Sequence, residues 1–209
     1  MGYYPIFIDV SRRRCLVIGG GAVAQRRIEG LLAARAIVTV ISPTITEALR
    51  NLIAQGMLRN VARVYKAGDL AGYDLAFVAT DDRAVNQAIF SDARLRGIWI
   101  NSADDPENCD FILPAVIRRG ELSIAISTGG ASPAATRAVR EELENYLTAD
   151  YARLVQIVSE VREELKAKSL VVSADAWNKA LKGEFRRSLT DARAEQAKAL
   201  LLKALGADS

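Results

Sequence analysis

The sequence predicts an α/β protein, with a Rossmann-type parallel sheet in its N-terminal part and a small helical domain at its C-terminal end. Two observations predict this. Apolar strand patterns alternate with helical patterns up to about residue 101, and from Tyr151 onward charged residues alternate with Leu, Val and Ala without any strand pattern. Alternating strands and helices form right-handed βαβ units, which give a parallel sheet covered on both faces.

The expected strands of this sheet are short apolar runs rich in β-branched residues, the composition typical of buried strands. These runs are Cys15–Ile18, Ile37–Ile41, Leu75–Ala79 and Ile98–Ile100, with a shorter strand expected at Val61–Tyr65.

Helices are expected between these strands. One begins at about Val23, directly after three glycines. Another spans Thr44–Gly56, where Thr44 with Glu47 three residues later has the spacing of a capping box. A third spans Arg83–Arg96 after Asp82, a residue type that often caps a helix N-terminus.

The chain changes character after this region. Strands are expected at Phe111–Ile117 and Leu122–Ile126, joined by a turn at residues 118–121. Ser132-Pro133 then begins a helix that reaches Leu147, because proline suits the first helical turn. Two to four further helices follow.

Composition limits the chemistry that the chain can use. It has 209 residues, a net charge of +3 and no histidine, so a general acid or base must be Asp, Glu, Lys, Tyr or Cys. We expect no metal site. The two cysteines, Cys15 and Cys109, lack metal or redox spacing and are expected to be reduced. The weak charge indicates no nucleic-acid partner.

The N-terminal residues do not have the pattern of a signal peptide, and no apolar run reaches the ~20 residues that a membrane-spanning helix needs. From these two observations we expect a cytoplasmic protein with no membrane association.

The stretch Gly19–Ala24 fits G-x-G-x-x-A, a form of the dinucleotide-binding fingerprint. In that fingerprint the first glycine makes the tight turn, the second lets the backbone approach a pyrophosphate, and the small third residue packs helix against strand. Because the motif follows an expected strand and opens an expected helix, it predicts a dinucleotide site at Gly19 and Gly21.

The end of the second strand departs from the usual pattern. An acidic residue commonly holds the ribose there, and an arginine accommodates a 2′-phosphate. Here the strand ends in Ser42-Pro43-Thr44, with neither residue type. We expect NAD rather than NADP, with Ser42 or backbone groups near Pro43 and Thr44 serving the ribose. Thr80 and Asp81, after a neighbouring strand, are also expected near the cofactor.

Several segments together resemble one family, the precorrin-2 dehydrogenases, which include the N-terminal module of siroheme synthase. The resemblance covers about residues 3–145. It is carried by Pro5-Ile6-Phe7, the segment Cys15–Arg27, Ala79-Thr80-Asp81-Asp82 with Val85-Asn86, Asn101–Pro106, and Ser127–Pro133.

This resemblance implies oxidation of precorrin-2, a tetrapyrrole, to sirohydrochlorin with NAD as the hydride acceptor. Some members also insert ferrous iron into sirohydrochlorin, a ferrochelatase (lyase) activity of siroheme biosynthesis. The resemblance further implies a homodimer with an NAD-binding domain at residues 1–113, a dimerisation segment at 114–147 and a helical domain at 148–209.

Residue roles follow from the same resemblance. Ala22 and Val23 would contact NAD after the glycines, as Pro43 and Thr44 would after the second strand. Asp104 matches the functional aspartate of the family, and is expected to take a proton or to steady the macrocycle. The alternative for Asp104 is a loop aspartate that caps Asn108.

Substrate binding would use cations and a glycine-rich loop, because precorrin-2 carries many carboxylates and arginine matches them well. Thr128 takes the place of a serine that some members phosphorylate, and the loop that contains it either binds an anion at the next helix or simply turns into that helix. The candidates are Arg118, Arg137, Arg140, Thr128 and Gly129.

Two other functions remain open at this point. One is a dehydrogenase for another substrate on the same scaffold. The other is an NAD-binding redox sensor or regulatory module without turnover.

Overall fold

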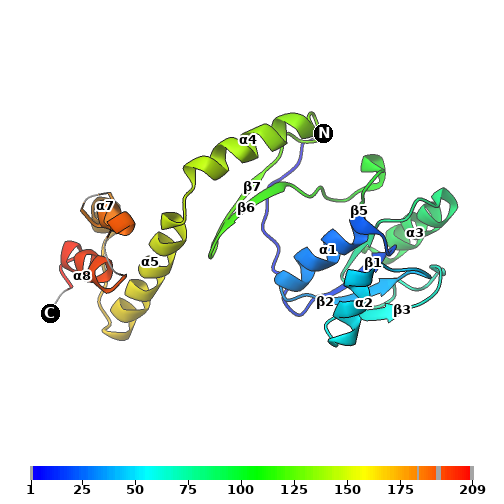
Figure 1. The fold of residues 1–209 in the computed structure, drawn as a ribbon, viewed down its shortest axis with the longest axis horizontal. Helices are drawn as coiled ribbons and strands as arrows, with labels where there is room; N and C mark the ends of the chain where they lie inside the picture. The colour runs from blue at the N-terminus through cyan, green and yellow to red at the C-terminus, as the bar shows by residue number, and fades with distance from the viewer. Residues whose placement is uncertain (1, 183, 192–193, 208–209) are drawn as a thin grey trace. The chain divides into compact units, whose positions relative to one another are not determined.

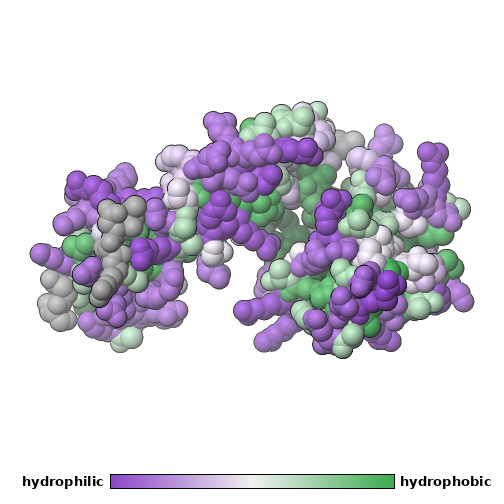
Figure 2. All heavy atoms as spheres, in the orientation of Figure 1, coloured by the Kyte–Doolittle hydropathy of each residue, from purple (hydrophilic) through white to green (hydrophobic). Residues whose placement is uncertain are grey.

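The computed structural model describes residues 2–182, 184–191 and 194–207. The chain divides into two compact units, Met1–Leu113 and Pro114–Ser209, which are drawn in Figure 1. The visible face of each unit is largely hydrophilic, with smaller apolar patches between the polar side chains (Figure 2).

The first unit contains a five-stranded parallel sheet in the order β3-β2-β1-β4-β5. Its strands are β1 (Arg14–Ile18), β2 (Ile37–Ile41), β3 (Arg59–Val61), β4 (Leu75–Val78) and β5 (Trp99–Ser102). Along the chain, β2 and β3 follow β1 on one side of it, and β4 and β5 then lie on its other side. The order therefore reverses between β1 and β4, the kind of position where open α/β sheets bind ligands.

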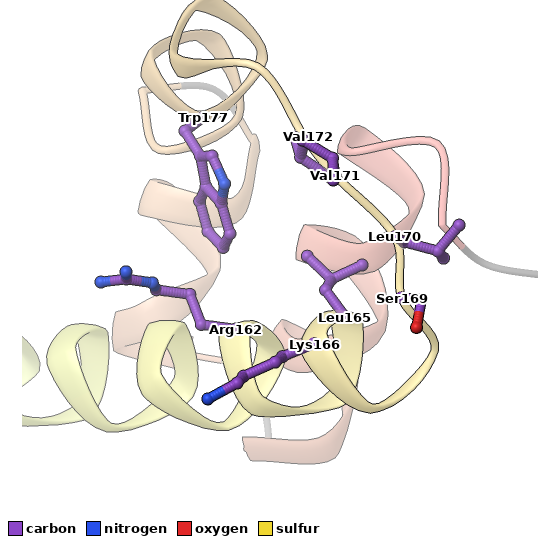
Figure 3. A pocket seen from close by; sticks show the side chains of 8 residues that line it. All are labelled: Arg162, Leu165, Lys166, Ser169, Leu170, Val171, Val172 and Trp177. Carbon is purple, nitrogen blue, oxygen red and sulfur yellow. The ribbon is translucent and has the colours of Figure 1, made fainter.

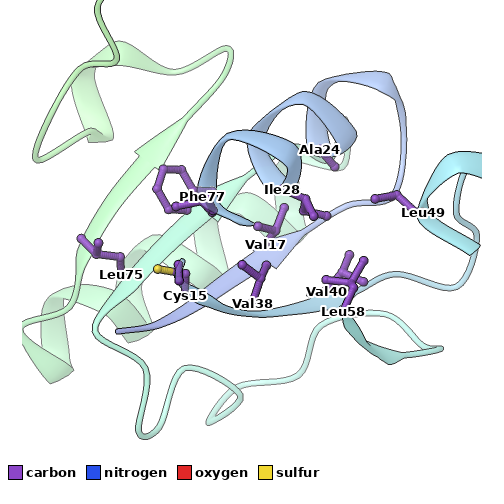
Figure 4. Packing of buried hydrophobic residues seen from close by; sticks show 12 residues of the cluster. Cys15, Val17, Ala24, Ile28, Val38, Val40, Leu49, Leu58, Leu75 and Phe77 are labelled. Atoms are coloured by element: carbon purple, nitrogen blue, oxygen red, sulfur yellow. The ribbon is translucent and has the colours of Figure 1, made fainter. Parts of the chain in front are cut away.

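Helices cover both faces of this sheet. The helices α1 (Ala22–Ala33) and α2 (Glu47–Ala54) lie on one face, where Ile28 and Leu49 belong to one buried cluster with the strand residues Val17 and Val40 (Figure 4). On the opposite face, α3 (Arg83–Arg96) contributes buried residues to a second cluster. Burial on both faces explains why the strands are continuous apolar runs rather than alternating patterns. The predicted parallel α/β fold is confirmed.

Two local predictions in this unit were wrong. The third strand spans Arg59–Val61 rather than Val61–Tyr65. Tyr65 instead leaves the sheet edge and donates a hydrogen bond to the buried carboxylate of Asp92 on α3, at 2.6 Å. Tyr65 therefore packs against α3 and does not pair in the sheet.

The second wrong prediction is the N-cap of α2. Thr46, and not Thr44, has extended backbone angles at the cap, and its hydroxyl accepts a hydrogen bond from Leu49 N at 3.3 Å. The same hydroxyl donates to Gln25 Oε1 at 2.8 Å, which links the start of α2 to α1. Glu47, expected as the distal member of a capping box, is instead the first residue of the helix.

The second unit begins with an antiparallel hairpin of β6 (Ala115–Arg119) and β7 (Leu122–Ile126). The strand was expected at Phe111–Ile117, but it begins at Ala115 and includes Arg118 and Arg119, so the turn is only Gly120-Glu121. Gly120 has a φ of +58°, which a two-residue hairpin turn favours. Arg119 then donates to the carbonyl oxygen of Leu147 at 2.6 Å.

The helix α4 (Pro133–Tyr146) follows the hairpin. Ser132 caps it by accepting a hydrogen bond from Ala135 N at 3.1 Å, with Pro133 in the first turn as expected. The described residues beyond it contain α5 (Asp150–Ala167), α6 (Ala174–Ala180), α7 (Glu184–Asp191) and α8 (Ala194–Ala204). These helices share one core that includes Ile157, Leu189 and Leu201. Within the described part of the chain, we find no helix long and apolar enough to span a membrane.

Candidate cofactor and substrate site

Four strands of the parallel sheet end in one row. Ile41, Ile18, Val78 and Ser102 lie side by side in the strand register, each being the last residue of its strand. The loops that follow β1, β2, β4 and β5 therefore leave the sheet at one level along its carboxyl edge. All of the residues predicted to bind NAD or to act in catalysis lie in these loops or at the helix start that follows.

The backbone ladder continues one step beyond this row. Gly19 N donates to Ile41 O at 3.0 Å, and Ala79 N donates to Ile18 O at 2.8 Å. Ala103 N likewise donates to Val78 O at 3.1 Å. The start of each of these loops is therefore fixed to the neighbouring strand by a backbone hydrogen bond.

Gly19 and Gly20 are required by the protein itself. Gly19 has a φ of +116°, and a side-chain carbon there would lie 2.1 Å from the carbonyl oxygen of Ala79. A side-chain carbon at Gly20 would lie 2.0 Å from the carbonyl oxygen of Thr44. Sequence reasoning missed Gly20 because the fingerprint leaves that position free. The turn after β1 is therefore enclosed on both sides by backbone from neighbouring loops.

Gly21 differs from the two glycines before it. Its φ is −82°, an angle that any residue can adopt. A side-chain carbon at this position would meet no atom of the described residues within 4 Å. Space is therefore left in front of Gly21 at the point where α1 begins, the position at which the dinucleotide fingerprint places a pyrophosphate.

The first turn of α1 offers hydrogen-bond donors to that space. Gln25 N donates to Gly21 O at 3.0 Å, so the amides of Ala22 to Ala24 precede the first bonded turn. The N-cap carries no side chain, and no acidic residue lies in the first turn. Free amides and the positive end of the helix dipole favour an anion. Ala24, the small third residue of the motif, is fully buried against the sheet.

At the end of β2 the Ser42 hydroxyl is engaged within its own loop, while the backbone at Pro43 and Thr44 is exposed. Ser42 is only 5% exposed, and its hydroxyl donates to the carbonyl oxygen of Thr44 at 2.6 Å. That bond shapes the loop, so the hydroxyl proton expected to serve the ribose already has a partner. Pro43 and Thr44, in contrast, are exposed.

The two candidates after β4 also differ. The Thr80 hydroxyl accepts a hydrogen bond from Asp82 N at 3.2 Å, and Asp82 in turn caps α3 through Ala84 N and Val85 N, as expected. Asp81 is exposed and has no hydrogen-bond or ion-pair partner among the described residues. The Thr80 side chain therefore helps to order the loop, while the Asp81 carboxylate is available to a ligand.

Asp104 lies two residues beyond the end of β5 and is exposed. Its carboxylate makes no hydrogen bond or ion pair with any described residue. The loop role considered as its alternative belongs to Asp105, whose carboxylate accepts a hydrogen bond from Asn108 Nδ2 at 2.8 Å. Since adjacent strands lie about 4.8 Å apart, β5 is roughly 10 Å from β1. A free carboxylate therefore extends from the sheet edge that carries the glycine turn.

The substrate-binding candidates lie in the second unit and are not equivalent. Arg118 and Arg137 are exposed and have no ion-pair partner among the described residues. Arg140 is paired with Glu144 at 2.8 Å on its own helix, which occupies the charge expected to bind substrate. The two free arginines are therefore the better candidates for substrate carboxylates.

The glycine-rich loop before α4 is held by its own polar groups. The Thr128 hydroxyl accepts a hydrogen bond from Ser132 N at 3.1 Å and lies 3.1 Å from the hydroxyl of Thr136. Gly129, with a φ of +64°, donates from its amide to the Ser127 hydroxyl at 3.0 Å. These bonds favour the interpretation of the loop as a turn into α4.

A groove in the helical region was not predicted from the sequence. It has a volume of about 460 Å³ and lies between the end of α5, residues 169–172 and α6. Arg162 and Lys166 lie along its α5 side, and the indole of Trp177 extends toward Arg162 (Figure 3). Because no acidic residue lines it, the groove lacks a carboxylate that could accept a proton.

Comparison with known proteins identifies the family. Residues 6–115, more than half of the chain, match a family described as "Putative NAD(P)-binding", and residues 119–146 match a family described as "Sirohaem biosynthesis protein central". A solved structure titled "SirC, precorrin-2 dehydrogenase" superposes with a TM-score of 0.78 and 30% sequence identity, covering 96% of this chain and 100% of that one.

Curated relatives agree with this assignment. The siroheme synthase of Methylococcus capsulatus is 38% identical over 99% of this chain, and that of Chromobacterium violaceum is 36% identical over 99%. In both cases the alignment spans 44% of the relative, so the chain covers less than half of these proteins. With family matches on both sides of residue 115 and a solved relative aligned along its whole length, the chain belongs to the siroheme-biosynthesis family that includes precorrin-2 dehydrogenase.

Proposed function

We propose that this chain oxidises precorrin-2 to sirohydrochlorin with NAD⁺, releasing NADH and a proton. The observation that carries the proposal is the pairing of two features on one sheet edge: the open space at Gly21 in front of α1, and the free carboxylate of Asp104 after β5. The structural relative titled precorrin-2 dehydrogenase supports the choice of substrate and reaction.

The residues along the edge fit a dinucleotide. The amides that follow Gly21 would hold the pyrophosphate, and backbone groups at Pro43 and Thr44 would hold the adenosine ribose at the end of β2. The other half of the cofactor would then extend past β4, beside Asp81. When bound, NAD⁺ supplies the acceptor for the hydride that leaves the substrate carbon.

The chain's own contribution to the chemistry is proton transfer. As conjugation extends around the macrocycle, one proton leaves for each hydride removed. Asp104 would accept that proton, because its carboxylate is free and no histidine exists in the chain to act instead. Arg118 and Arg137 would orient the substrate through its rim carboxylates.

NAD fits the end of β2 better than NADP does. A 2′-phosphate would need a cation near Pro43 and Thr44. Two arginines of this region are already engaged: Arg63 after β3 pairs with Asp69 at 2.6 Å, and Arg50 on α2 donates to the carbonyl oxygen of Ile45 at 3.2 Å. No acidic residue holds the ribose either, so recognition there would rest on backbone groups.

Iron insertion is a second activity that the same site could support. Metal insertion releases two pyrrole protons, and Asp104 would again be the acceptor, with ferrous iron as a substrate. The siroheme synthase relatives favour this activity by name. In the assay below, a separate arm tests it.

The second unit supports the proposal that the protein is a homodimer. α4 has no fully buried residue, and Val116 on β6 and Val139 on α4 are 40% and 42% exposed. A two-stranded hairpin rarely stands alone in water, so a second copy would cover these apolar side chains. Light scattering of the purified protein tests this. Division of the second unit at residue 147 and a cytoplasmic location remain predictions.

The test of function is anaerobic incubation of the purified protein with precorrin-2, followed by absorbance. Separate arms contain NAD⁺, NADP⁺, and NAD⁺ with ferrous iron. Sirohydrochlorin formation with NAD⁺ supports the dehydrogenase, and a siroheme spectrum that appears faster than without enzyme supports iron insertion. Binding of NAD⁺ with no conversion in any arm would favour the alternative, a regulatory module without turnover.

A further inference from the structure

The outer edge of β5 is covered by Cys109 and Asp110 of the returning chain rather than by another strand. β5 is the last strand of the sheet, so the backbone groups on its outer side have no strand partner. Asp110 binds both backbone polar groups of Ile100. The Asp110 amide donates to Ile100 O at 2.9 Å, and the Asp110 carboxylate accepts from Ile100 N at 2.8 Å. The chain that returns after the Asp104 loop is thus attached directly to the strand before the loop.

Cys109 makes the corresponding contacts at the end of the strand. Ser102 N donates to Cys109 Sγ at 3.0 Å, and the thiol lies 3.4 Å from Ser102 O. The same sulfur lies 3.2 Å from the carbonyl oxygen of Asp105, the nearer of the two acceptors for its single S–H proton. One sulfur atom therefore contacts the backbone of Ser102, before Asp104, and the backbone of Asp105, directly after it.

Further contacts brace the far side of this loop. Asp105 accepts a hydrogen bond from Asn108 Nδ2 at 2.8 Å, and Asn108 Oδ1 accepts one from Arg94 on α3 at 2.8 Å. The short 3₁₀ helix Pro106–Asn108 lies between these contacts. Cys109 Sγ holds the start of the loop, and the bond from Arg94 to Asn108 holds its other side to α3. These contacts fix the backbone around Asp104 without any bond to the Asp104 carboxylate.

We infer that Cys109 is a positioning residue for the Asp104 carboxylate. The inference rests on the proposed function, in which Asp104 takes the substrate proton. Burial raises the pKa of the Cys109 thiol, so the sulfur keeps its proton at neutral pH and remains a donor. A catalytic group that is displaced by about 1 Å can lose on the order of 100-fold in rate. Loosening the loop should therefore slow chemistry without weakening cofactor binding at Gly21.

The chain offers a matched control. Cys15 is also a reduced thiol, but it is fully buried in the apolar core of the first unit, where it packs with Val17 and Phe77. Replacing Cys15 with alanine removes a thiol and loosens the same unit without touching the Asp104 loop. A general loss of stability would therefore affect both cysteine variants, whereas a positioning effect would appear only at Cys109.

The experiment measures kcat and KM for precorrin-2, and Kd for NAD⁺, in Cys109→Ala, Cys109→Ser and Cys15→Ala. We expect Cys109→Ala to lower kcat by roughly 10- to 100-fold with Kd for NAD⁺ within about twofold of wild type. Cys109→Ser keeps a donor and an acceptor and should recover part of the loss. Cys15→Ala should keep its kcat. An unchanged kcat in Cys109→Ala, or an equal fall in both alanine variants, overturns the inference.

A double-mutant cycle separates positioning from a merely structural role. If Cys109 acts through Asp104, Cys109→Ala should change the residual rate of an Asp104→Asn variant by less than about twofold. A loss as large as that in the wild-type background would show that the two residues act independently and would overturn the inference.

A second readout separates this inference from the proposed function. If the wild-type protein does not oxidise precorrin-2, the proposed function fails, and hydrogen exchange then tests the loop. Cys109→Ala should speed exchange of the Ser102 amide, which loses its acceptor, while Cys15→Ala should not do so specifically. Unchanged exchange at Ser102 would overturn the assigned role of the sulfur even in an active enzyme.

Discussion

A side-chain carbon at Gly19 would lie 2.1 Å from the carbonyl oxygen of Ala79. The loops after β1 and β4 are therefore in contact through backbone atoms alone, at the point where the strand order reverses. Gly20 meets the loop after β2 at the carbonyl oxygen of Thr44 and at the side chains of Ser42 and Ile45, so three loops hold one another in place. The space in front of Gly21 is built on this arrangement.

Substitutions of these glycines should separate folding from cofactor binding. We expect Gly21→Ala to keep the thermal stability of the protein while raising Kd for NAD⁺ at least about tenfold, because the added methyl group takes the room of the pyrophosphate. Calorimetric titration with NAD⁺ and thermal unfolding measure the two quantities. Gly19→Ala is the comparison, and it should lower the stability because its side chain collides with Ala79. Tight NAD⁺ binding by Gly21→Ala would contradict the assignment of the cofactor site.

The arginines of the second unit should differ in their effect on substrate binding. We expect Arg118→Ala and Arg137→Ala each to raise KM for precorrin-2 by about three- to fivefold, the range of one exposed ion pair. Arg140→Ala should have a smaller effect, because Glu144 already neutralises that side chain. Steady-state kinetics measure these values, with Arg137→Lys as the charge-conserving control. Equal effects of all three alanine variants would contradict the ranking.

The corrected cap of α2 also predicts a stability difference. Thr46→Ala should lower the free energy of unfolding of the first unit by about 1 kcal/mol, a typical cost of a lost N-cap. Thr44→Ala should change it little, since its role in the loop uses only the backbone carbonyl. Urea unfolding can be followed by the fluorescence of Trp99 in a Trp177→Phe background. A larger loss for Thr44→Ala would restore the original capping prediction.

The buried carboxylate of Asp92 should make the first unit sensitive to acid. Burial alone would raise its pKa, but hydrogen bonds from Tyr65, Gly68 N and Arg96 outweigh that effect, so its pKa lies below the usual 3.8. A lowered folded-state pKa stabilises the fold above the unfolded-state value, and this contribution is lost as pH falls through the folded-state value.

Asp92→Ala should therefore cost about 2–3 kcal/mol at neutral pH, because it leaves the Tyr65 hydroxyl buried without its acceptor. The difference from wild type should narrow below about pH 4. Trp99 fluorescence again reports the unfolding, and the exposed Asp81→Ala is the control. A difference that does not depend on pH would show that the charge of Asp92 contributes nothing.

Much of the first unit could be predicted because its signals are local. The strand Ile37–Ile41 and the helix Arg83–Arg96 have the predicted bounds, since β-branched runs, an aspartate cap and a glycine at the helix end act within a few residues. The segment around Tyr65 could not be predicted in the same way. Its partner, Asp92, is 27 residues away, and an apolar pattern alone does not distinguish packing on a helix from pairing in a sheet.

The candidate site was predictable in place but not in detail. The dinucleotide fingerprint pointed to Gly21 and the family resemblance to Asp104, and the structure places both at the carboxyl edge because parallel strands end together there. The hydroxyl of Ser42 turned out to be occupied within its own loop, and the sulfur of Cys109 to contact Ser102 and Asp105. Which polar group faces a ligand and which faces its own loop depends on backbone angles that sequence patterns do not specify.

The most direct test of the account is a single-turnover measurement of Asp104→Asn beside wild type. The enzyme, saturated with NAD⁺, is mixed anaerobically with precorrin-2, and the formation of NADH and sirohydrochlorin is followed. We expect the variant to bind NAD⁺ as wild type does but to react about 10²- to 10⁴-fold more slowly, the usual contribution of a general base. A variant that reacts at the wild-type rate would remove Asp104 from the chemistry and contradict the central claim.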